Sequence, residues 1–169
     1  MELNVNIFTR RSVRKYTGEP VSPGDIETII KAGMYAPSAR NGQPWQFIVI
    51  DDRSLLEQIA ATHRNAQMVK DASLALVVCG DPALTSRPVY LQLDLGAAIE
   101  NVLLAAHGLG LGAVWCGVYP DEARTSGLKA LLGIPAEVQP MALIPLGYPA
   151  ETPEEPERFK PERIHHNTW

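Results

Sequence analysis

The stretch that most constrains the fold is residues 90–109, which reads as one long helix with apolar side chains around most of its circumference. Asp94 and Glu100 are among its few charged side chains. A helix that is apolar nearly all round must be buried on all sides. A domain of 169 residues can build a substantial core, but it has difficulty covering such a helix alone. We therefore expect part of this helix to pack against a second copy of the chain.

The rest of the chain reads as alternating helices and strands. Ser22 is a good N-cap and Pro23 fits the first helical position, so a helix is expected from there to the residue before Pro37. Periodicity and turn residues predict further helices over residues 53–61 and 120–132, and strands over residues 45–50, 73–79, 113–118 and 138–146. Pro140 and Pro145 interrupt the last strand and predict that it has an exposed or irregular edge.

The glycines at positions 108, 110 and 112 invite a dinucleotide-binding interpretation, which the order of the elements excludes. That fingerprint needs a strand before its glycines and a helix after them. Here a helix comes first and an apolar strand follows, so we expect the glycines to end the helix with left-handed geometry.

Composition bounds the class of protein. With 46% hydrophobic and 20% charged residues the chain is an ordinary globular domain, and its net charge of −4 argues against nucleic acid as a partner. No run of 18 apolar residues and no N-terminal signal pattern is evident, so we expect no membrane partner and a cytoplasmic protein. Cys79 and Cys116 have no metal or redox spacing, and His165-His166 lacks a third ligand at suitable spacing, so no metal site is predicted.

Against this acidic background, four Arg and Lys side chains gather in residues 10–16, with no carboxylate among them. If the segment is helical, Arg10 and Arg14 lie one turn apart and repel each other unless an anion is bound there. Guanidinium groups offer a planar fork of donors that suits phosphate, and the Ser12 hydroxyl can donate or accept. A solvated basic turn is the alternative, but a second polar loop soon afterwards favours a ligand site.

This second polar loop occupies residues 37–45 and carries two prolines, a glycine and four polar side chains. Ser38, Asn41 and Gln43 supply both donors and acceptors, which suits recognition of a heterocycle edge. A strongly apolar strand follows at once and anchors the loop on its far side. A plain surface connection is the alternative interpretation.

The tail, residues 147–169, differs in kind from the rest of the chain. It holds four prolines and five glutamates and has little that can pack by itself, so alone it looks disordered. It also carries Arg158 and Lys160 and has Ile164 and Trp169 near its end. Apolar and cationic side chains in such a segment favour an arm laid over a partner.

Three motifs together resemble the FMN-dependent nitroreductase family: Arg10-Arg11-Ser12-Val13-Arg14, the run from Ala36-Pro37-Ser38 to Gln43-Pro44-Trp45, and Trp115-Cys116-Gly117 after the glycine turn. The resemblance covers nearly the whole chain, in the order and at the separations expected. It implies a single α+β domain over residues 1–169, with a central mixed or antiparallel β-sheet flanked by helices. It also implies a homodimer with FMN at the subunit interface, and a C-terminal arm, residues 147–169, extended onto the partner subunit.

The resemblance assigns a cofactor-binding role to each motif. Arg10, Arg11 and Ser12 would contact the FMN phosphate and ribityl chain, and Arg14 would approach the flavin near N1 and C2=O. The residues expected to line the ring from the other chain are Pro37, Ser38, Ala39, Asn41 and Gln43. Those expected beside the ring, with backbone groups near N5 and O4, are Val114, Trp115, Cys116 and Gly117. The remaining expected contacts are Asn65, which matches a flavin-contacting Asn of longer members, and Arg158 and Lys160, which would complete the phosphate site.

The chain departs from the longer members of the family in two ways. Those members often carry Lys three residues after the flavin-contacting Asn, where this chain has Met68, which leaves the flavin redox potential open. The chain is also short for the family, so we expect an open, poorly selective substrate pocket.

The implied activity is that of an oxidoreductase in which FMN N5, rather than a catalytic side chain, is the reacting group. NADH or NADPH would deliver hydride and leave, and a nitroaromatic, a quinone or a similar flat acceptor would take its place, giving ping-pong kinetics. No paired carboxylates and no nucleophile with a base are identified in the sequence, and Cys116 is expected to pack rather than react. The alternatives are a non-catalytic module that stores or delivers FMN, and a specialised enzyme of the same fold, such as a flavin-dependent dehalogenase.

Overall fold

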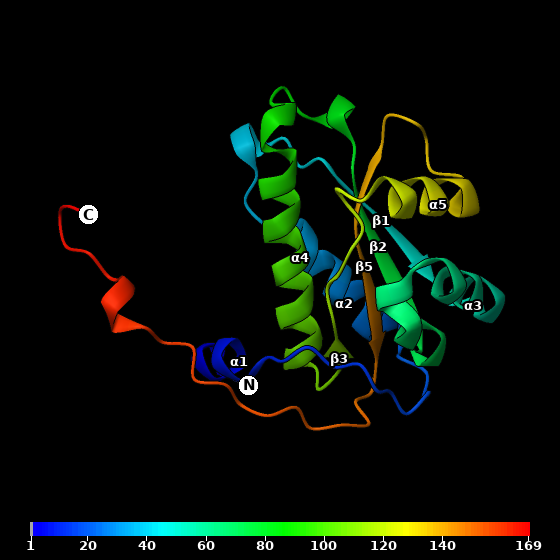
Figure 1. The fold of residues 1–169 in the computed structure, drawn as a ribbon, viewed down its shortest axis with the longest axis horizontal. Helices are drawn as coiled ribbons and strands as arrows, with labels where there is room; N and C mark the ends of the chain where they lie inside the picture. Colours follow the sequence, from blue (N-terminus) through cyan, green and yellow to red (C-terminus); the bar gives the residue numbers. More distant parts are fainter. Residues whose placement is uncertain (1) are drawn as a thin grey trace.

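The computed structural model describes residues 2–169 and has an α+β fold, with one sheet between helices (Figure 1). The helices are α1 (Leu3–Thr9), α2 (Pro23–Met34), α3 (Arg53–Thr62), α4 (Leu91–Gly108) and α5 (Glu122–Leu132). The strands are β1 (Trp45–Ile50), β2 (Leu74–Gly80), β3 (Gly112–Ala113), β4 (Cys116–Gly117) and β5 (Gln139–Gly147). From α2 onward helices and strands alternate along the chain as the sequence predicts, except that β3 and β4 are consecutive, and α1 was not predicted.

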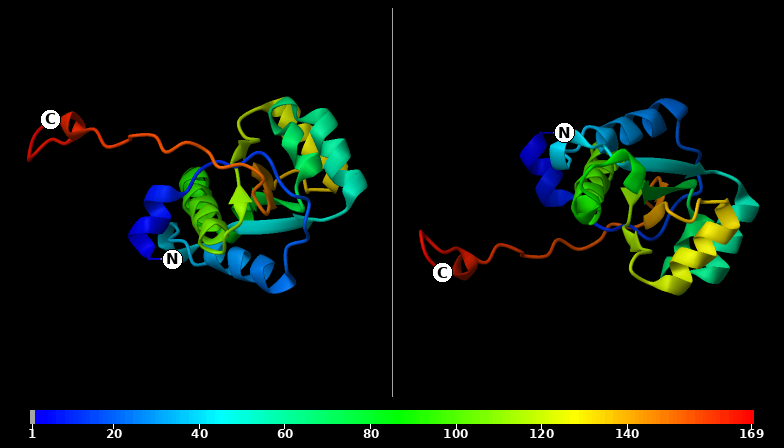
Figure 2. Two further views of the ribbon diagram at one scale, coloured as in Figure 1. Left: turned by 90° about the horizontal axis from the view of Figure 1, so that it is seen from below. Right: turned by 90° about the horizontal axis from the view of Figure 1, so that it is seen from above.

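The sheet is antiparallel throughout and has the spatial order β1-β2-β5-β3, with β4 also paired to β5. Strand β2 is buried over its whole length. Successive side chains of a strand point to opposite faces. The residues Leu74, Leu76 and Val78 pack in one core cluster with α2 and α4, whereas Ala75 and Val77 pack in another with α3 and α5. The sheet therefore separates these two pairs of helices, as the views from below and from above in Figure 2 show.

Helix α4 lies in the first of these clusters. Leu95 and Val102 are completely buried there, as the apolar sequence predicts. The N-terminal end of the helix is not covered by other parts of residues 2–169. Leu93 is 70% exposed there, and Val89, just before the helix, is 75% exposed. The segment Pro88–Gly108 is long and apolar enough to cross a membrane, but a core helix of a globular protein passes the same test. The uncovered end is the part of α4 that a second chain could cover.

The helix ends follow the local sequence signals. The Ser22 hydroxyl accepts a hydrogen bond from the Asp25 amide at 3.1 Å, which confirms the predicted N-cap of α2. Gly110 has a φ of 78° after α4, and Gly133 has a φ of 66° after α5. Both values lie in the left-handed region that glycine tolerates best, so both helices end where the sequence predicts.

Two predicted strands differ in the structure. Residues 113–118 do not form one strand, because β3 and β4 pair with β5 separately and Trp115 between them is 37% exposed. Strand β5 lies in the interior of the sheet, between β2 and β3, so the predicted exposed edge is wrong. The predicted irregularity is confirmed, since the register against β2 shifts between Val78 and Cys79, where β5 presents Pro140. Proline lacks the N–H that a regular ladder needs, and the register shift accommodates it.

The C-terminal segment leaves the body of the protein after β5 and runs outward as an extended arm (Figures 1 and 2). Its large apolar side chains are exposed: Phe159 by 70%, Ile164 by 52% and Trp169 by 100%. His165 stacks on Trp169, with ring centroids 4.5 Å apart. Within one chain the apolar side chains of the arm therefore remain uncovered.

Candidate functional site

The basic segment, residues 10–16, is extended, which corrects the helical geometry considered from the sequence. Ser12 forms a parallel bridge with Ala113, and the Val13 amide donates to the Ala113 carbonyl at 3.0 Å. Val13 and Tyr16 are buried, and the Tyr16 hydroxyl donates to the Val13 carbonyl at 2.7 Å. Burial of these two side chains fixes the segment against the sheet and leaves Arg14 exposed between them.

Carboxylates from distant parts of the chain reach two cations of this segment. Arg10 Nε lies 3.2 Å from Glu100 Oε1 on α4, and Arg11 Nη2 lies 3.4 Å from Glu155 Oε1 in the arm. Arg11 also donates to the Phe8 carbonyl at 2.7 Å. Tertiary structure therefore supplies part of the neutralisation that the local sequence lacks.

Arg14 differs from these two cations. Its side chain is exposed and forms no ion pair within residues 2–169. Its backbone amide donates to Glu151 Oε1 at 2.6 Å, which ties the start of the arm to the basic segment. Ser12, two residues earlier, is partly exposed. Arg14, Ser12 and the exposed Lys15 are thus polar side chains of the segment that stay open to an external anion.

Residues 114–117 form a wall beside the basic segment, because they follow directly on the residue that pairs with Ser12. The Gly117 carbonyl accepts hydrogen bonds from His63 Nε2 and from Arg124 Nη1, both at 3.1 Å. Cys116 Sγ lies 4.0 Å from the Asn65 carbonyl oxygen. The structure therefore brings predicted site residues from three separate parts of the chain together here: Ser12, Asn65 and the wall.

Burial sets the protonation of two side chains at this wall. It raises the pKa of the Cys116 thiol to about 11, so the thiol is protonated at neutral pH and packs as a small apolar group. His63 is only 2% exposed, and this burial lowers its pKa because the charged imidazolium would lose its contact with water. The neutral imidazole must carry its proton on Nε2 to donate to the Gly117 carbonyl. His63 therefore holds the wall in place as an uncharged donor.

The polar loop presents the predicted side chains as one hydrogen-bonded network. The Ser38 hydroxyl accepts from the Gln43 amide at 3.0 Å, and Gln43 Nε2 donates to Asn41 Oδ1 at 3.1 Å. Asn41 and Gln43 are exposed, as is Pro37 at the start of the loop. Ala39 donates its amide proton to Asp94 Oδ1 on α4 at 2.9 Å. The loop is therefore held from behind by α4, with its amide side chains facing outward.

Helix α4 stands between this loop and the wall. Asp94 faces the loop, whereas a Cβ placed on Gly96 would lie 3.9 Å from the Trp115 ring. Residues two positions apart on a helix are about 200° apart around its axis and do not face each other. Within one chain the loop and the wall therefore lie on different sides of α4, although both are predicted to line the same ring.

The remaining predicted contacts lie on the arm and under the basic segment. Arg158 and Arg10 line one hollow, whereas Lys160 is exposed on the arm outside it. Met68 packs with Val13 and Tyr16 beneath the basic segment, so the position that departs from the family pattern fills the core.

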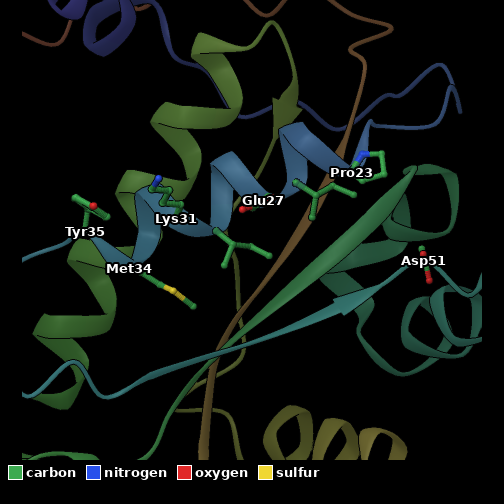
Figure 3. Close-up of a pocket in the computed structure, with 8 residues that line it drawn as sticks. Pro23, Glu27, Lys31, Met34, Tyr35 and Asp51 are labelled. Atoms are coloured by element: carbon green, nitrogen blue, oxygen red, sulfur yellow. The ribbon is translucent and has the colours of Figure 1, made fainter.

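An apolar groove of about 680 Å³ runs along α2 (Figure 3). Its lining residues come from α2, from Tyr35 just after it and from the residue after β1: Pro23, Ile26, Glu27, Ile30, Lys31, Met34, Tyr35 and Asp51. Strand β1 is an edge strand that pairs only with β2 within residues 2–169. An apolar groove near an unpaired strand edge suits an extended segment of another chain.

Sequence reasoning missed four side chains of the site: His63, Asp94, Glu100 and Glu155. Two of them carried a usable signal, because Asp94 and Glu100 interrupt an apolar helix and a charge there needs a partner. No local pattern marks His63 or Glu155, since each meets a residue far away in the sequence; His63 and Gly117 are 54 positions apart.

The fold and the site together define an α+β protein in which exposed cations lie next to a partly exposed aromatic side chain, Trp115. Comparison with known sequences narrows this class: the chain belongs to the Nitroreductase family, whose sequence profile matches residues 7–86 and 63–148. It is 47% identical over 169 residues to a protein of Methanothermobacter thermautotrophicus named "Putative NADH dehydrogenase/NAD(P)H nitroreductase", covering 100% of this chain and 88% of the relative.

Solved structures agree with this family. A crystal structure from Parabacteroides distasonis with the same name superposes with a TM-score of 0.92 at 41% identity, covering 97% of this chain and 96% of that one. A structure from Desulfovibrio desulfuricans, titled "putative nitroreductase in complex with fmn", superposes with a TM-score of 0.84 at 34% identity, covering 100% of this chain and 99% of that one. The predicted fold is therefore confirmed.

Proposed function

We propose that this protein reduces nitroaromatics, quinones or similar flat, electron-poor acceptors, with electrons from NAD(P)H, by a ping-pong mechanism. Its family and the named relative make it an NAD(P)H-dependent flavin oxidoreductase, and its cofactor is FMN. The class of acceptor rests on two supports. These are the name of the relative and the partial exposure of Trp115, which leaves the wall accessible to a flat molecule.

The residues present fit FMN. A phosphate group carries a charge of about −1.5 to −2 at neutral pH and binds best to guanidinium donors. Arg10 and Arg158 supply guanidinium donors in one hollow, which Glu100 and Glu155 also line, and the Ser12 hydroxyl adds a further donor. The amide side chains of Asn41 and Gln43 can both donate to and accept from the polar edge of a heterocycle. The polar groups of the site thus match the two ends of the cofactor.

When bound, FMN supplies the redox chemistry, transferring hydride between nicotinamide and acceptor. The residues of the chain bind and orient it. Arg14 would place positive charge near N1 and C2=O, and the wall at residues 114–117 would lie beside the ring. Donor and acceptor would use the same exposed face of the ring in turn, which is the physical basis for ping-pong kinetics.

The working unit that we propose is a homodimer with FMN at its interface. The observation that supports it is the placement of the polar loop and the wall on different sides of α4. If both line one ring, the loop must come from a second copy. The uncovered N-terminal end of α4, with Leu93 70% exposed, offers an apolar surface for that copy.

The arm of each chain would reach the partner subunit and lie in the groove along the partner's α2. Its exposed Ile164 and Trp169 match the apolar lining of the groove, and Arg163 could pair with Glu27 or Asp51 at the rim. An extended segment there would also lie beside the unpaired edge of β1. We place this dimer in the cytoplasm, with no nucleic acid and no membrane as partner.

The visible absorption spectrum of the purified protein tests the proposal. A flavin spectrum that bleaches on anaerobic addition of NADH or NADPH, and recovers with menadione or a nitroaromatic, is the expected result. It would also identify the preferred donor. A bound flavin that neither nucleotide bleaches would instead favour a protein that stores or delivers FMN. A colourless protein that takes up no added FMN would overturn the proposal.

A further inference from the structure

The carboxylate of Asp94 is buried in the otherwise apolar helix α4, with the residue only 5% exposed. Its Oδ1 accepts the Ala39 amide proton at 2.9 Å. Its Oδ2 is buried and has no hydrogen-bond partner within residues 2–169. Burying a carboxylate costs free energy unless hydrogen bonds compensate for the lost water, so a buried acid with one bond calls for an explanation beyond packing.

The loop that Asp94 holds has an unusual backbone. Arg40, Asn41 and Gln43 have φ values of 52°, 55° and 49°, although none of them is glycine. Side chains other than glycine rarely adopt this left-handed region, and such residues persist only where their surroundings hold them. Strain of this kind concentrates at ligand sites. The loop conformation therefore depends on its anchors.

Three anchors hold the loop. Asp94 holds Ala39, the Asp81 amide donates to the Pro44 carbonyl at 2.8 Å, and Gly42 fits tightly against Thr85. A Cβ on Gly42 would lie only 2.8 Å from the Thr85 hydroxyl oxygen. The Pro44 anchor lies beyond the strained residues, and the Thr85 anchor is a contact of shape alone. Asp94 hydrogen-bonds Ala39, the residue directly before the strained ones, and so ties the loop to α4, whereas the Ser38 hydroxyl bonds the Gln43 amide only within the loop.

We propose that Asp94 is a positioning residue for the flavin site. Its carboxylate fixes the Ala39 amide and thereby holds Asn41 and Gln43 in the orientation that lets them meet the ring. The role rests on the proposed function, since it assumes that this loop contacts FMN. It differs from a packing role because an apolar residue of similar size would fill the same space and release the loop.

The test compares Asp94→Ala and Asp94→Asn with wild type. Removing the acceptor should weaken FMN binding by about tenfold to a hundredfold and shift the flavin midpoint potential. It should also speed amide hydrogen exchange at residues 39–43. The Asn variant keeps an oxygen that can accept from Ala39, so it should restore most of the affinity and protection.

The matched control is Asp52→Ala. Asp52 also accepts a backbone amide at 2.9 Å, from Leu55, but it caps α3 away from the loop. This variant should lose stability without changing FMN affinity, midpoint potential or loop exchange. If Asp94→Ala does not fold, Asp94→Leu, which removes the acceptor and still fills the space, is used for the same measurements.

Wild-type affinity and potential in the variants without the acceptor, with unchanged loop exchange, would overturn the proposal. A wild-type protein that binds no FMN would refute the proposed function instead. In that case hydrogen exchange alone decides whether Asp94 holds the loop.

Discussion

The three arginines of the basic segment differ in what surrounds their guanidinium groups, and therefore in whether they are free to bind a ligand. Arg10 and Arg11 already have carboxylate partners in Glu100 and Glu155, whereas Arg14 is exposed. The sequence identifies the cluster, because four cations without a carboxylate stand out locally. It could not identify the two glutamates, since only tertiary packing brings α4 and the arm to the segment. A binding site was therefore predictable from the sequence. Which of its cations are already paired with carboxylates, and which remain available to a ligand, was not.

Replacement of Arg14 by Ala should weaken FMN binding and lower the flavin midpoint potential while leaving the fold intact. A charge-assisted contact to the flavin edge is worth about 1.5–3 kcal/mol, which corresponds to roughly tenfold to a hundredfold in affinity. Flavin fluorescence titration and potentiometry measure the two effects. Lys15→Ala is the matched control, because Lys15 is a neighbouring exposed cation with no assigned contact. Unchanged affinity and potential in Arg14→Ala would mean that Arg14 faces only solvent.

The buried His63 predicts how stability depends on pH. Burial lowers its folded-state pKa below the ordinary value of 6.5, with the Arg124 charge acting in the same direction and Asp121 against it. The unfolded state therefore binds the proton more readily. The contribution of neutral His63 to the stability of the folded state is therefore fully present above pH 6.5, and it is lost as the pH falls below that value. Burial and the charges of Arg10 and Arg11 also lower the pKa of His107, which adds to the same trend.

Urea titrations across pH 5–8 should thus show a falling free energy of unfolding on the acid side. The slope should be shallower in His63→Gln, whose amide can still donate to the Gly117 carbonyl. An identical acid slope in wild type and variant would assign the dependence to other groups.

At the scale of elements, helices with caps were the most predictable part of the chain and the β5 pairing the least. The N-cap at Ser22 and the glycine stop at Gly133 are local signals, and both occur as predicted. The position of β5 in the sheet depends on partners far away in the sequence. Its prolines suggested an edge, but a register shift against β2 lets it lie in the interior. Local sequence signals therefore predict where helices and strands begin and end. The order of the strands in the sheet depends on pairing between distant residues and could not be predicted in this way.

The contact between α2 and α4 gives a prediction at this scale. A Cβ on Gly33 would lie 2.9 Å from Val102 Cγ2 and 3.0 Å from Phe47 Cζ, so Gly33→Ala should push the helices apart. We expect a loss of about 1–3 kcal/mol in the free energy of unfolding. Gly127→Ala in α5 is the matched control, because nothing lies within 4 Å of its added Cβ. That variant should gain about 0.5–1 kcal/mol. Equal effects of the two variants in denaturant titrations would argue against close packing at Gly33.

For the whole molecule, the arm provides the test of assembly. A chain ending at Glu157 keeps the Arg11–Glu155 ion pair but lacks Arg158, Ile164 and Trp169. If the arm secures the dimer, this chain should dissociate at micromolar concentration and lose FMN affinity together with its partner. Size-exclusion chromatography with light scattering, followed by FMN titration, measures both. A full-length monomer, or a shortened chain that stays dimeric with full affinity, would contradict the proposed assembly.

The prolines of the arm bear on how such an assembly forms. Pro149, Pro153, Pro156 and Pro161 fix φ at four positions of the arm, whose first part up to Glu155 is bonded to the basic segment and whose remainder extends outward. A segment restricted in this way samples fewer conformations when free, so it loses less entropy when it is laid down on another surface. The arm is in this sense preorganised, because its prolines already restrict the backbone in the free chain and reduce the conformational entropy that binding a partner would remove.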